Sequence, residues 1–521
     1  MPSALTFPGV YIEEISSGVR PIIGVATSIT AFIGRTTRGP TNEPLRVNNF
    51  GEFERRFGGI DYHCPLTYSV RQFFLNGGTD AVIVRVANEG SAFKAAGIVN
   101  SLPLRARGEG EWGDNIQVRI DHQTRSISSP QREFNLFIRD RATQAVETFR
   151  NLSLDPQDPK YFVTVLEQDS ALVESDPGQS LPTAVPGEHA EITDPTVNPW
   201  ETDGFFSLLA GGKNGDDLED SDVAGKPVKK TGIYALEKLD LFNILCIPPL
   251  TKKSFENSAA LYGEAAAYCT KRRAILIVDP SGDKTTVEDG EKIATSDLFN
   301  STAANRKNMA IFFPWIKAAD PVRDNRLDKF APSGAVAGIM ARTDLTRGVW
   351  KSPAGIEAGL VGVNDFTFNM TNEENGRLNI LGINCLRNFR GVGNVVWGSR
   401  TLDGGDRLGS EWKYLAVRRF TLFLEESLYR GTQWVVFEPN DEPLWAQIRL
   451  NVGAFMQNLF RQGAFQGRSP REAYFVRCGS DTTTQNDINR GIVNIEVGFA
   501  PLKPAEFVVI KFQQITGKID T

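Results

Sequence analysis

Very few residues of this chain could act as a general base near neutral pH. Its 521 residues include three histidines, at positions His63, His122 and His189. Histidine is the usual base that takes the proton of a nucleophilic serine in a Ser-His-Asp triad. Because residues 190–521 contain no histidine, a triad confined to that part of the chain is excluded. A serine hydrolase stays as a minor alternative, in which a histidine would have to reach in from elsewhere.

The cysteines and the glycine-rich stretches predict no disulfide, metal or nucleotide chemistry. The phosphate-loop pattern GxxxxGK followed by Ser or Thr is absent, and Gly391-Val392-Gly393 lacks the third glycine of a dinucleotide fingerprint. Asp216-Asp217 lacks the later glutamate of a calcium loop. We therefore expect no cofactor. The cysteines are odd in number and form no CxxC pair, so we expect free thiols in a reducing compartment at Cys64, Cys246, Cys269, Cys385 and Cys478.

The C-terminal end of the chain has the pattern of an extended strand. Val508, Ile510 and Phe512 share one face of that strand. Pro501 and Pro504 precede it, hold the chain extended and cannot donate to a ladder. No hairpin partner follows, so the strand must pair with a sheet edge in its own domain or in a neighbouring copy. We favour the neighbouring copy.

The stretch from Pro443 to Arg471 is basic, although the chain as a whole is acidic. Its apolar positions from Leu444 to Leu459 follow a helical stripe. It contains no Asp or Glu, and its arginines either face solvent or form a docking face for an acidic partner: Arg449, Arg461, Arg468 and Arg471. The net charge of the whole chain is only −6, so a general nucleic-acid binder is not expected.

The elements around these residues predict a mixed α/β fold of about three domains. The apolar runs Phe242–Ile247 and Ala274–Val278 flank a helix over Ser254–Arg273, with Ser254 as a possible N-cap. Runs that are apolar throughout indicate strands buried on both faces, so this βαβ unit predicts a parallel sheet. Small residues in a helix over 332–343 would allow close packing.

Changes in composition divide the chain into six segments. We expect an N-terminal arm (1–22), an α/β core (23–90 and 231–400) with a β-rich insertion (91–230), an α+β C-terminal domain (401–500) and a C-terminal arm (501–521). Within the C-terminal domain, Trp434–Phe437 and Ile492–Val497 are predicted strands. No apolar run reaches the roughly 18 residues of a membrane helix. The N-terminus also lacks the basic and apolar regions of a secretory signal, so we expect a cytoplasmic protein.

Several stretches match, in the same order along the chain, the pattern of one known family. They are PGVYIEE near residue 8, GVATSITAFIG at 24–34, RTDLTRGVWKSPAG at 342–355, SLYRGTQWVVFEPND at 427–441 and IVNIEVGFAPLKPAEFVVIKF near the end. Together they resemble the contractile tail sheath proteins of phages and of bacterial phage-tail-like injection systems. The resemblance spans both ends and most of the second half, and it hardly touches residues 91–230.

This resemblance implies a structural protein and not an enzyme, with a subtilisin-like core. Its subunits would stack helically in hexameric rings around an inner tube and contract by near-rigid rotation. Further implied partners are baseplate and terminator or cap proteins, without nucleic acid or direct membrane insertion. Assembly is expected in the cytoplasm of a bacterium, as part of a phage tail (a virion component) or a tail-like particle. The alternative within the same machines is another tail or baseplate component.

The resemblance also implies roles for particular residues. Family members exchange both terminal arms with neighbouring subunits. Carried over to this chain, the exchanged arm residues are Val10, Tyr11, Ile12, Phe507, Val508, Val509, Ile510 and Phe512. The implied contacts with the inner tube protein are Arg449 and Arg461 on the basic helix.

Overall fold

The structure is a computed structural model that describes residues 20–125, 132–194, 196–251 and 257–511. It divides into two compact units. The larger unit consists of residues 27–346 and 353–415, and the smaller unit combines residues 1–26, 347–352 and 416–521. The smaller unit therefore joins the C-terminal part of the chain to the N-terminal residues.

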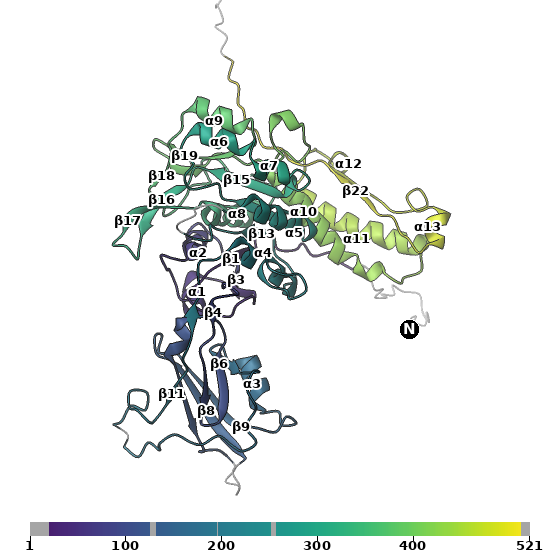
Figure 1. The fold of residues 1–521 in the computed structure, drawn as a ribbon. Helices are drawn as coiled ribbons and strands as arrows, with labels where there is room; N and C mark the ends of the chain where they lie inside the picture. Colours follow the sequence, from purple (N-terminus) through teal and green to yellow (C-terminus); the bar gives the residue numbers. More distant parts are fainter. Residues whose placement is uncertain (1–19, 126–131, 195, 252–256, 512–521) are drawn as a thin grey trace, which may run out of the picture. The chain divides into compact units, whose positions relative to one another are not determined.

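The larger unit is built on an eight-stranded sheet within the described residues, in the order β2-β3-β1-β13-β14-β15-β19-β20 (Figure 1). The inner strands run parallel, and the edge strands β2 and β20 are antiparallel to their neighbours. Most inner strands are buried along their whole length, which confirms the predicted parallel sheet. In sheet order the strands are Leu45–Val47, Ala81–Arg85, Thr30–Gly34, Ile244–Cys246, Ile275–Val278, Met309–Phe313, Asn384–Phe389 and Gly393–Val396.

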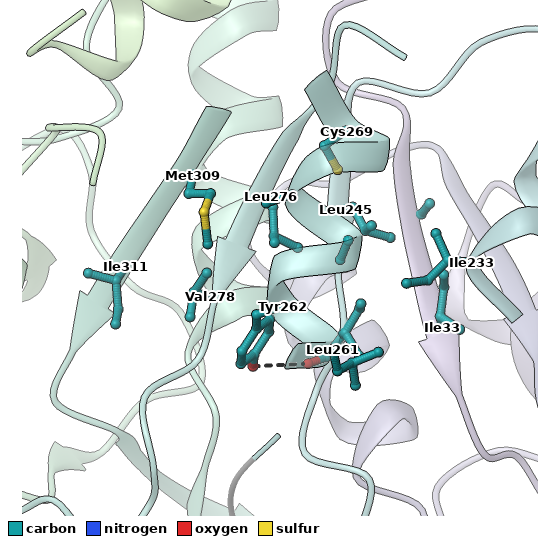
Figure 2. Packing of buried hydrophobic residues seen from close by; sticks show 14 of the residues in the cluster. Ile33, Ile233, Leu245, Leu261, Tyr262, Cys269, Leu276, Val278, Met309 and Ile311 are labelled. Carbon is teal, nitrogen blue, oxygen red and sulfur yellow. Dashed lines mark hydrogen bonds between the residues drawn. The ribbon is translucent and has the colours of Figure 1, made fainter. Parts of the chain in front are cut away.

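Helix α5 (Ala259–Lys271) packs its apolar side against this sheet. Figure 2 shows Leu261 and Cys269 of α5 among buried residues of the strands, including Leu245 and Leu276. The helix begins later than the predicted Ser254. Its N-cap is Ser258, whose side chain accepts a hydrogen bond from the backbone N–H of Leu261, and Ser254 lies outside the described residues. The remaining helices of this unit are α1 (Phe50–Phe57), α2 (Pro65–Leu75), α3 (Phe162–Asp169), α4 (Asp220–Ala224), α6 (Val287–Ile293), α7 (Asp297–Ser301), α8 (Ser333–Arg347) and α9 (Asn372–Asn379).

Helices α2 and α8 approach closely because α8 carries glycines where they touch. A Cβ atom on Gly334 would lie 2.1 Å from the carbonyl oxygen of Ser69, and one on Gly338 would lie 2.4 Å from that of Phe73. Both distances are far below van der Waals contact. The small residues predicted in this helix therefore do allow close packing, against α2.

The described residues of 92–214 form two antiparallel sheets around a separate apolar core, and β4 and β12 pair in a third, two-stranded sheet. One sheet has the order β10-β6-β5 and the other β11-β7-β8-β9, with α3 packed beside β10. Phe134, Leu136 and Ile138 of β8 point into the core, as their alternation predicts. The strands are β4 (Ala92–Phe93), β5 (Ala96–Val99), β6 (Leu102–Ala106), β7 (Ile116–Asp121), β8 (Glu133–Asp140), β9 (Val146–Ser153), β10 (Val173–Ser175), β11 (Ser207–Leu208) and β12 (Lys213–Asn214).

A buried arginine joins these sheets to the main sheet. Arg85 ends β3, and its guanidinium donates to the backbone carbonyls of Thr36 at 3.2 Å, Gly39 at 2.9 Å and Glu109 at 2.6 Å. Burial lowers the pKa of Arg85 to about 10. The three carbonyls come from both sides of the junction, so one side chain fixes the place where residues 92–214 leave the core.

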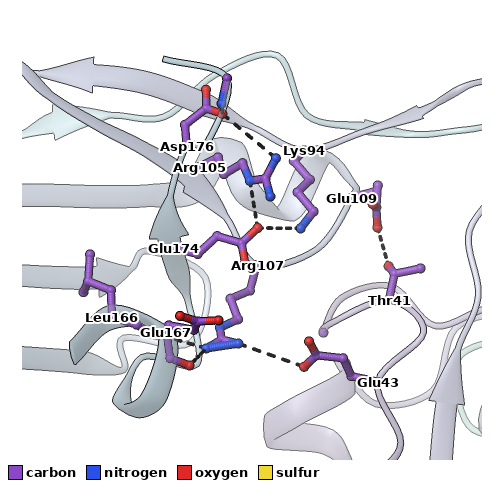
Figure 3. A network of polar contacts seen from close by, with 12 residues as sticks. Thr41, Glu43, Lys94, Arg105, Arg107, Glu109, Leu166, Glu167, Glu174 and Asp176 are labelled. Carbon is purple, nitrogen blue, oxygen red and sulfur yellow. Dashed lines mark hydrogen bonds and ion pairs between the residues drawn. The ribbon is translucent and has the colours of Figure 1, made fainter. Parts of the chain in front are cut away.

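Surface ion pairs lie near the same junction, and one of them crosses it. Figure 3 shows Glu174 accepting from Lys94 and from Arg105, each at 2.7 Å, within residues 92–214. Arg107 reaches the carbonyl of Glu167 and lies 4.0 Å from the carboxylate of Glu43. Exposed pairs of this kind contribute little individually, so the buried Arg85 is the main polar link.

A smaller sheet of order β17-β16-β18 completes the larger unit. Its strands are β16 (Ile316–Asp320), β17 (Arg326–Phe330) and β18 (Asp365–Phe366). Short 3-10 helices cover Glu111–Asn115, Gly232–Lys238, Arg306–Asn308, Asp406–Leu408 and Gln433–Val435, the last in the smaller unit.

The smaller unit is a helical pair with a β-ribbon. Helices α10 (Leu415–Gly431) and α11 (Glu442–Arg461) lie side by side (Figure 1) and share one apolar core. The other elements are α12 (Pro470–Ala473), β21 (Tyr474–Arg477), α13 (Gln485–Asn489) and β22 (Glu496–Phe499). Together the two units confirm the mixed α/β class.

Two predicted strands of this unit need correction. The predicted strand Trp434–Phe437 is wrong, because Gln433–Val435 form a 3-10 helix in the connection between α10 and α11. The apolar residues of Trp434–Phe437 pair with no strand in the described part of the chain. The predicted strand Ile492–Val497 is displaced to Glu496–Phe499, where it pairs with β21.

Candidate assembly surfaces

The first described residues lie along α10 and α11. The backbone N–H of Arg20 donates to Asn451 Oδ1 at 3.1 Å, and that of Val25 donates to Ser427 Oγ at 3.2 Å. Between them, a Cβ atom on Gly24 would lie 2.9 Å from the ring of Phe423, so only glycine fits there without a shift. The end of the predicted arm (1–22) and the residues that follow it are therefore docked on the smaller unit. Val10, Tyr11 and Ile12 lie outside the described residues.

The C-terminal segment pairs with no strand among the described residues. After the bridge between Phe465 and Pro501, residues 502–511 form no helix or strand. Phe507, Val508, Val509 and Ile510 are 71–81% exposed, and Phe512 lies outside the described residues. Four consecutive exposed apolar residues are unusual for an isolated soluble chain. As far as residue 511, the segment predicted as a strand pairs with no described strand.

The β-ribbon just before this segment is itself small. Strands β21 and β22 pair with each other from Tyr474↔Phe499 to Arg477↔Glu496. Each has no other strand neighbour in the described residues. A two-stranded ribbon leaves backbone donors and acceptors along its outer edges, and such edges are templates for another strand.

The two arginines predicted to contact an inner tube differ in their surroundings. Arg449 is half-buried, donates to the backbone carbonyl of Cys478 and forms an ion pair with Glu442 at 2.5 Å. Arg461 is exposed at the end of α11 and has no ion pair within the described part of the chain. Of the two, Arg461 is the cation that α11 leaves available to a partner.

One polar residue of α11 is buried. Asn451 lies inside the smaller unit, where its side chain accepts from the backbone N–H of Arg20. The exposed stripe of the helix consists of Gln447, Leu450, Ala454, Asn458 and Arg461. It is mostly uncharged, so the basic character is confined to its C-terminal end.

A serine–carboxylate pair lies at the end of β14, in the larger unit. The carboxylate of Asp279 accepts from the N–H of Ser333 at 2.9 Å and from its hydroxyl at 2.6 Å. Both residues are buried, and burial raises the pKa of Asp279 to about 7. Ser333 opens α8, so the aspartate acts as a helix cap supplied from elsewhere in the chain.

The histidines have other contacts within the described residues. His189 Nδ1 accepts from the N–H of Ile120 at 3.0 Å, and burial lowers its pKa. His122 Nε2 bonds the carbonyl of Pro186 at 2.8 Å. The ring of His63 packs edge-on against Tyr62. The arrangement needed to activate a serine is therefore not formed at Ser333 in the described residues.

The described cysteines are all buried free thiols, as predicted. Burial raises the pKa of Cys64 and of Cys385 to about 12, so both stay protonated. Across the described ranges, no group of three or more His, Cys, Asp or Glu side chains could hold a metal ion. The same ranges contain no helix that is both long and apolar enough to cross a membrane.

Family models match most of the second half of the chain. The model described as phage tail sheath protein central domain matches residues 218–402, and the phage tail sheath C-terminal domain matches residues 409–515. The chain belongs to the phage tail sheath family. The resemblance seen in the sequence motifs is thus confirmed, and the matched region includes both α11 and the exposed C-terminal segment of this sheath protein.

Individual relatives agree with that assignment. The chain is 20% identical over 473 residues to the tail sheath protein of Vibrio phage KVP40, covering 82% of this chain and 68% of the relative. Its fold resembles the contracted helical sheath of the anti-feeding prophage, with a TM-score of 0.59, 22% identity and coverage of 98% and 100%. A chain in the baseplate structure of the same particle gives a TM-score of 0.58, 21% identity and the same coverage.

Proposed function

We propose that this sheath protein polymerises into a helical sheath around an inner tube and contracts to drive the tube through a target envelope. Family membership and the full-length similarity in fold support the proposal. The observation that carries it in this chain is the exposed segment Phe507–Ile510, which comes a few residues after a β-ribbon of only two described strands. In a polymer, a second copy of the chain is always present to pair with this segment and bury its side chains.

The free energy of burying this segment is large enough to hold copies together. Fully burying one large apolar side chain is worth about 1.5–3 kcal/mol, and four such side chains are exposed here. Backbone hydrogen bonds between this segment and an edge strand of the ribbon would also fix the register of the pairing. The exchanged arms are then Phe507–Ile510 with Phe512 at one end and Val10–Ile12 at the other. They link copies into hexameric rings that stack helically, with a baseplate and a cap protein at the ends.

Arg461 is the residue of α11 that we assign to the inner tube. A single exposed cation contributes weakly and is screened by salt. Weak contacts suit an extended sheath that must release its tube on contraction. Arg449 supports this surface from within, since its guanidinium is already held by Glu442 and Cys478.

Contraction needs an energy source, and assembly can store it. An extended polymer held by the tube is metastable, and a trigger at the baseplate would release each subunit in turn. Subunits would rotate as near-rigid bodies while the arms keep neighbours joined. The packed parallel sheet and the close α2–α8 contact suit a subunit that moves without deforming.

The hydrolase alternative depends on a subtilisin-like core, which stays a prediction. Ser333, the first residue of α8, faces the carboxylate of Asp279 at the end of β14, yet its hydroxyl is buried and donates to that carboxylate. A serine-directed fluorophosphonate probe should therefore leave the folded protein unlabelled. Labelling of Ser333 would favour the hydrolase.

Electron microscopy tests the main proposal. Purified full-length chain, concentrated at low salt, should form striated cylinders in negative stain. Another tail or baseplate component would instead form discrete rings or complexes. A chain that stays monomeric in size-exclusion chromatography under all such conditions would overturn the sheath assignment.

A further inference from the structure

We propose that Val436 and Phe437, which we call the tip, contact a second copy of this chain in the polymer. The tip lies in the connection between α10 and α11, outside both arms and away from Arg461 in sequence. This inference rests on the proposed polymer, and it adds an interface that arm exchange does not require.

Phe437 has a conformation that its own chain does not explain. Its φ is 69°, in the left-handed region, and its side chain is fully exposed at 103%. Val436 beside it is 63% exposed. A bulky residue in this region is a genuine outlier, and such strain is typical of functional positions. Because the ring packs on nothing in the described chain, contact with a partner would offset the cost of this backbone conformation.

The tip is held firmly by its neighbours in sequence. The N–H of Val435 donates to the carbonyl of Thr432 at 3.0 Å, and the N–H of Glu438 donates to the carbonyl of Val435 at 3.1 Å. Asn440 then accepts from Trp445 Nε1 and donates to the carbonyl of Ile492, both at 2.9 Å. The exposed ring is thus presented on a braced turn between two long helices, as a binding residue should be.

The path of the N-terminal segment indicates which partner reaches the tip. Followed from Val25 towards the N-terminus, the chain runs along α10. Val25 is hydrogen-bonded to Ser427, Ile22 packs on Gly431, and the guanidinium of Arg20 lies 4.7 Å from the ring centroid of Trp434. It reaches the end of the described chain close to the tip, with 19 residues still to come. At most about 3.5 Å per residue, these span roughly 65 Å. An arm that leaves here for another copy departs from beside the tip, and a copy lying against the tip is well within its reach.

One further observation shows that the tip region lacks a partner, and another favours a second copy over the inner tube. The indole N–H of Trp434 is buried without an acceptor among the described residues, so the tip region is incomplete in the single chain. The tip is also flanked by the exposed carboxylates of Glu438 and Asp441. An acidic tube surface of the kind that would attract Arg461 would repel these carboxylates.

A fluorescent label at the tip tests this directly. Because the described native cysteines are all buried, Phe437→Cys offers a selective site for an environment-sensitive dye such as bimane. Labelled chain is mixed one to ten with wild-type chain, so that the polymer still forms. We expect at least a threefold fall in acrylamide quenching on polymerisation. Equal quenching in polymer and monomer would overturn the tip interface while leaving the sheath proposal intact.

A substitution that tolerates the left-handed backbone gives a second test. Phe437→Asn removes the ring, and asparagine adopts the left-handed conformation more readily than phenylalanine does. The melting temperature of the monomer should therefore not fall. The critical concentration for polymerisation should rise at least tenfold. Phe93→Ala, which truncates an exposed phenylalanine in the larger unit, should leave it unchanged. A Phe437→Asn chain that polymerises like wild type, or whose monomer is destabilised, would contradict the proposal.

Discussion

Asp279 holds the first turn of α8 through Ser333, from which it accepts both a backbone N–H at 2.9 Å and a hydroxyl at 2.6 Å. The carboxyl lies at the end of β14, in the middle of the parallel sheet. Burial outweighs these two hydrogen bonds and raises its pKa from 3.8 to about 7. The link between sheet and helix is therefore sensitive to pH near neutrality.

The raised pKa predicts a pH-dependent stability of the larger unit. The folded state keeps a proton that the unfolded state loses, so the free energy of unfolding falls as pH rises from about 4 through 7. Above pH 7 this contribution is constant. A difference of about three pH units corresponds to roughly 4 kcal/mol. Asp279→Asn cannot ionise, so urea unfolding at a series of pH values should show a flatter profile for it. An identical slope in both proteins would contradict the buried, protonated Asp279.

The close contact of α2 and α8 predicts a strong effect of one methyl group. Gly334→Ala would push a Cβ atom to 2.1 Å from the Ser69 carbonyl, and overpacking of this kind costs about 1–3 kcal/mol. Gly263→Ala in α5 is the matched control, because its Cβ would meet nothing within 4 Å. It should stabilise the protein by about 0.5–1 kcal/mol. Thermal unfolding of the two variants should move in opposite directions; equal shifts would argue against the tight contact.

Arg85 predicts how firmly residues 92–214 are attached. Arg85→Met leaves the carbonyls of Thr36, Gly39 and Glu109 without their donor, at a cost of about 1–3 kcal/mol for each group left unsatisfied. Limited proteolysis near residues 36–41 should become faster. Arg46→Met removes an exposed ion pair with Asp80 and should change the unfolding free energy by less than about 1 kcal/mol. Similar proteolysis of both variants would show that Arg85 is dispensable.

The surroundings of the two arginines predict different results for charge reversal on α11. Arg461→Glu should slow assembly templated by purified inner tube, and most at low salt, because screening weakens exposed charges. Arg449→Glu should lower the stability of the smaller unit instead, by placing a second carboxylate beside Glu442. Arg326→Glu reverses an exposed charge of β17 in the larger unit and serves as the control. Normal tube-templated assembly with Arg461 reversed would remove the assignment.

Much of the larger unit could be predicted because its signals are local. The apolar runs of β13 and β14 and the glycines of α8 mark buried strands and a close helix contact without any knowledge of the rest. The alternation in β8 likewise indicates a sheet with one buried face. The start of α5 was misplaced because Ser254 and Ser258 are equally good caps by residue type.

Several features of the smaller unit depend on residues far away in the sequence and could not be predicted. Asn451 has the polarity of a surface residue, and its burial follows from Arg20, 431 positions away. Val435–Phe437 have the composition of a strand, yet the two helices around them leave no strand to pair with. The different surroundings of Arg449 and Arg461 depend on the carbonyl of Cys478, which no spacing reveals.

The most direct test of the account is sedimentation of the chain that ends at Glu506. Removing residues 507–521 takes away the exposed apolar segment Phe507–Ile510, which pairs with no strand in the described part of the chain. The account predicts a folded monomer with unchanged circular dichroism and no polymer at concentrations where the full chain forms cylinders. Polymers of normal appearance from the shortened chain would contradict arm exchange through the C-terminus.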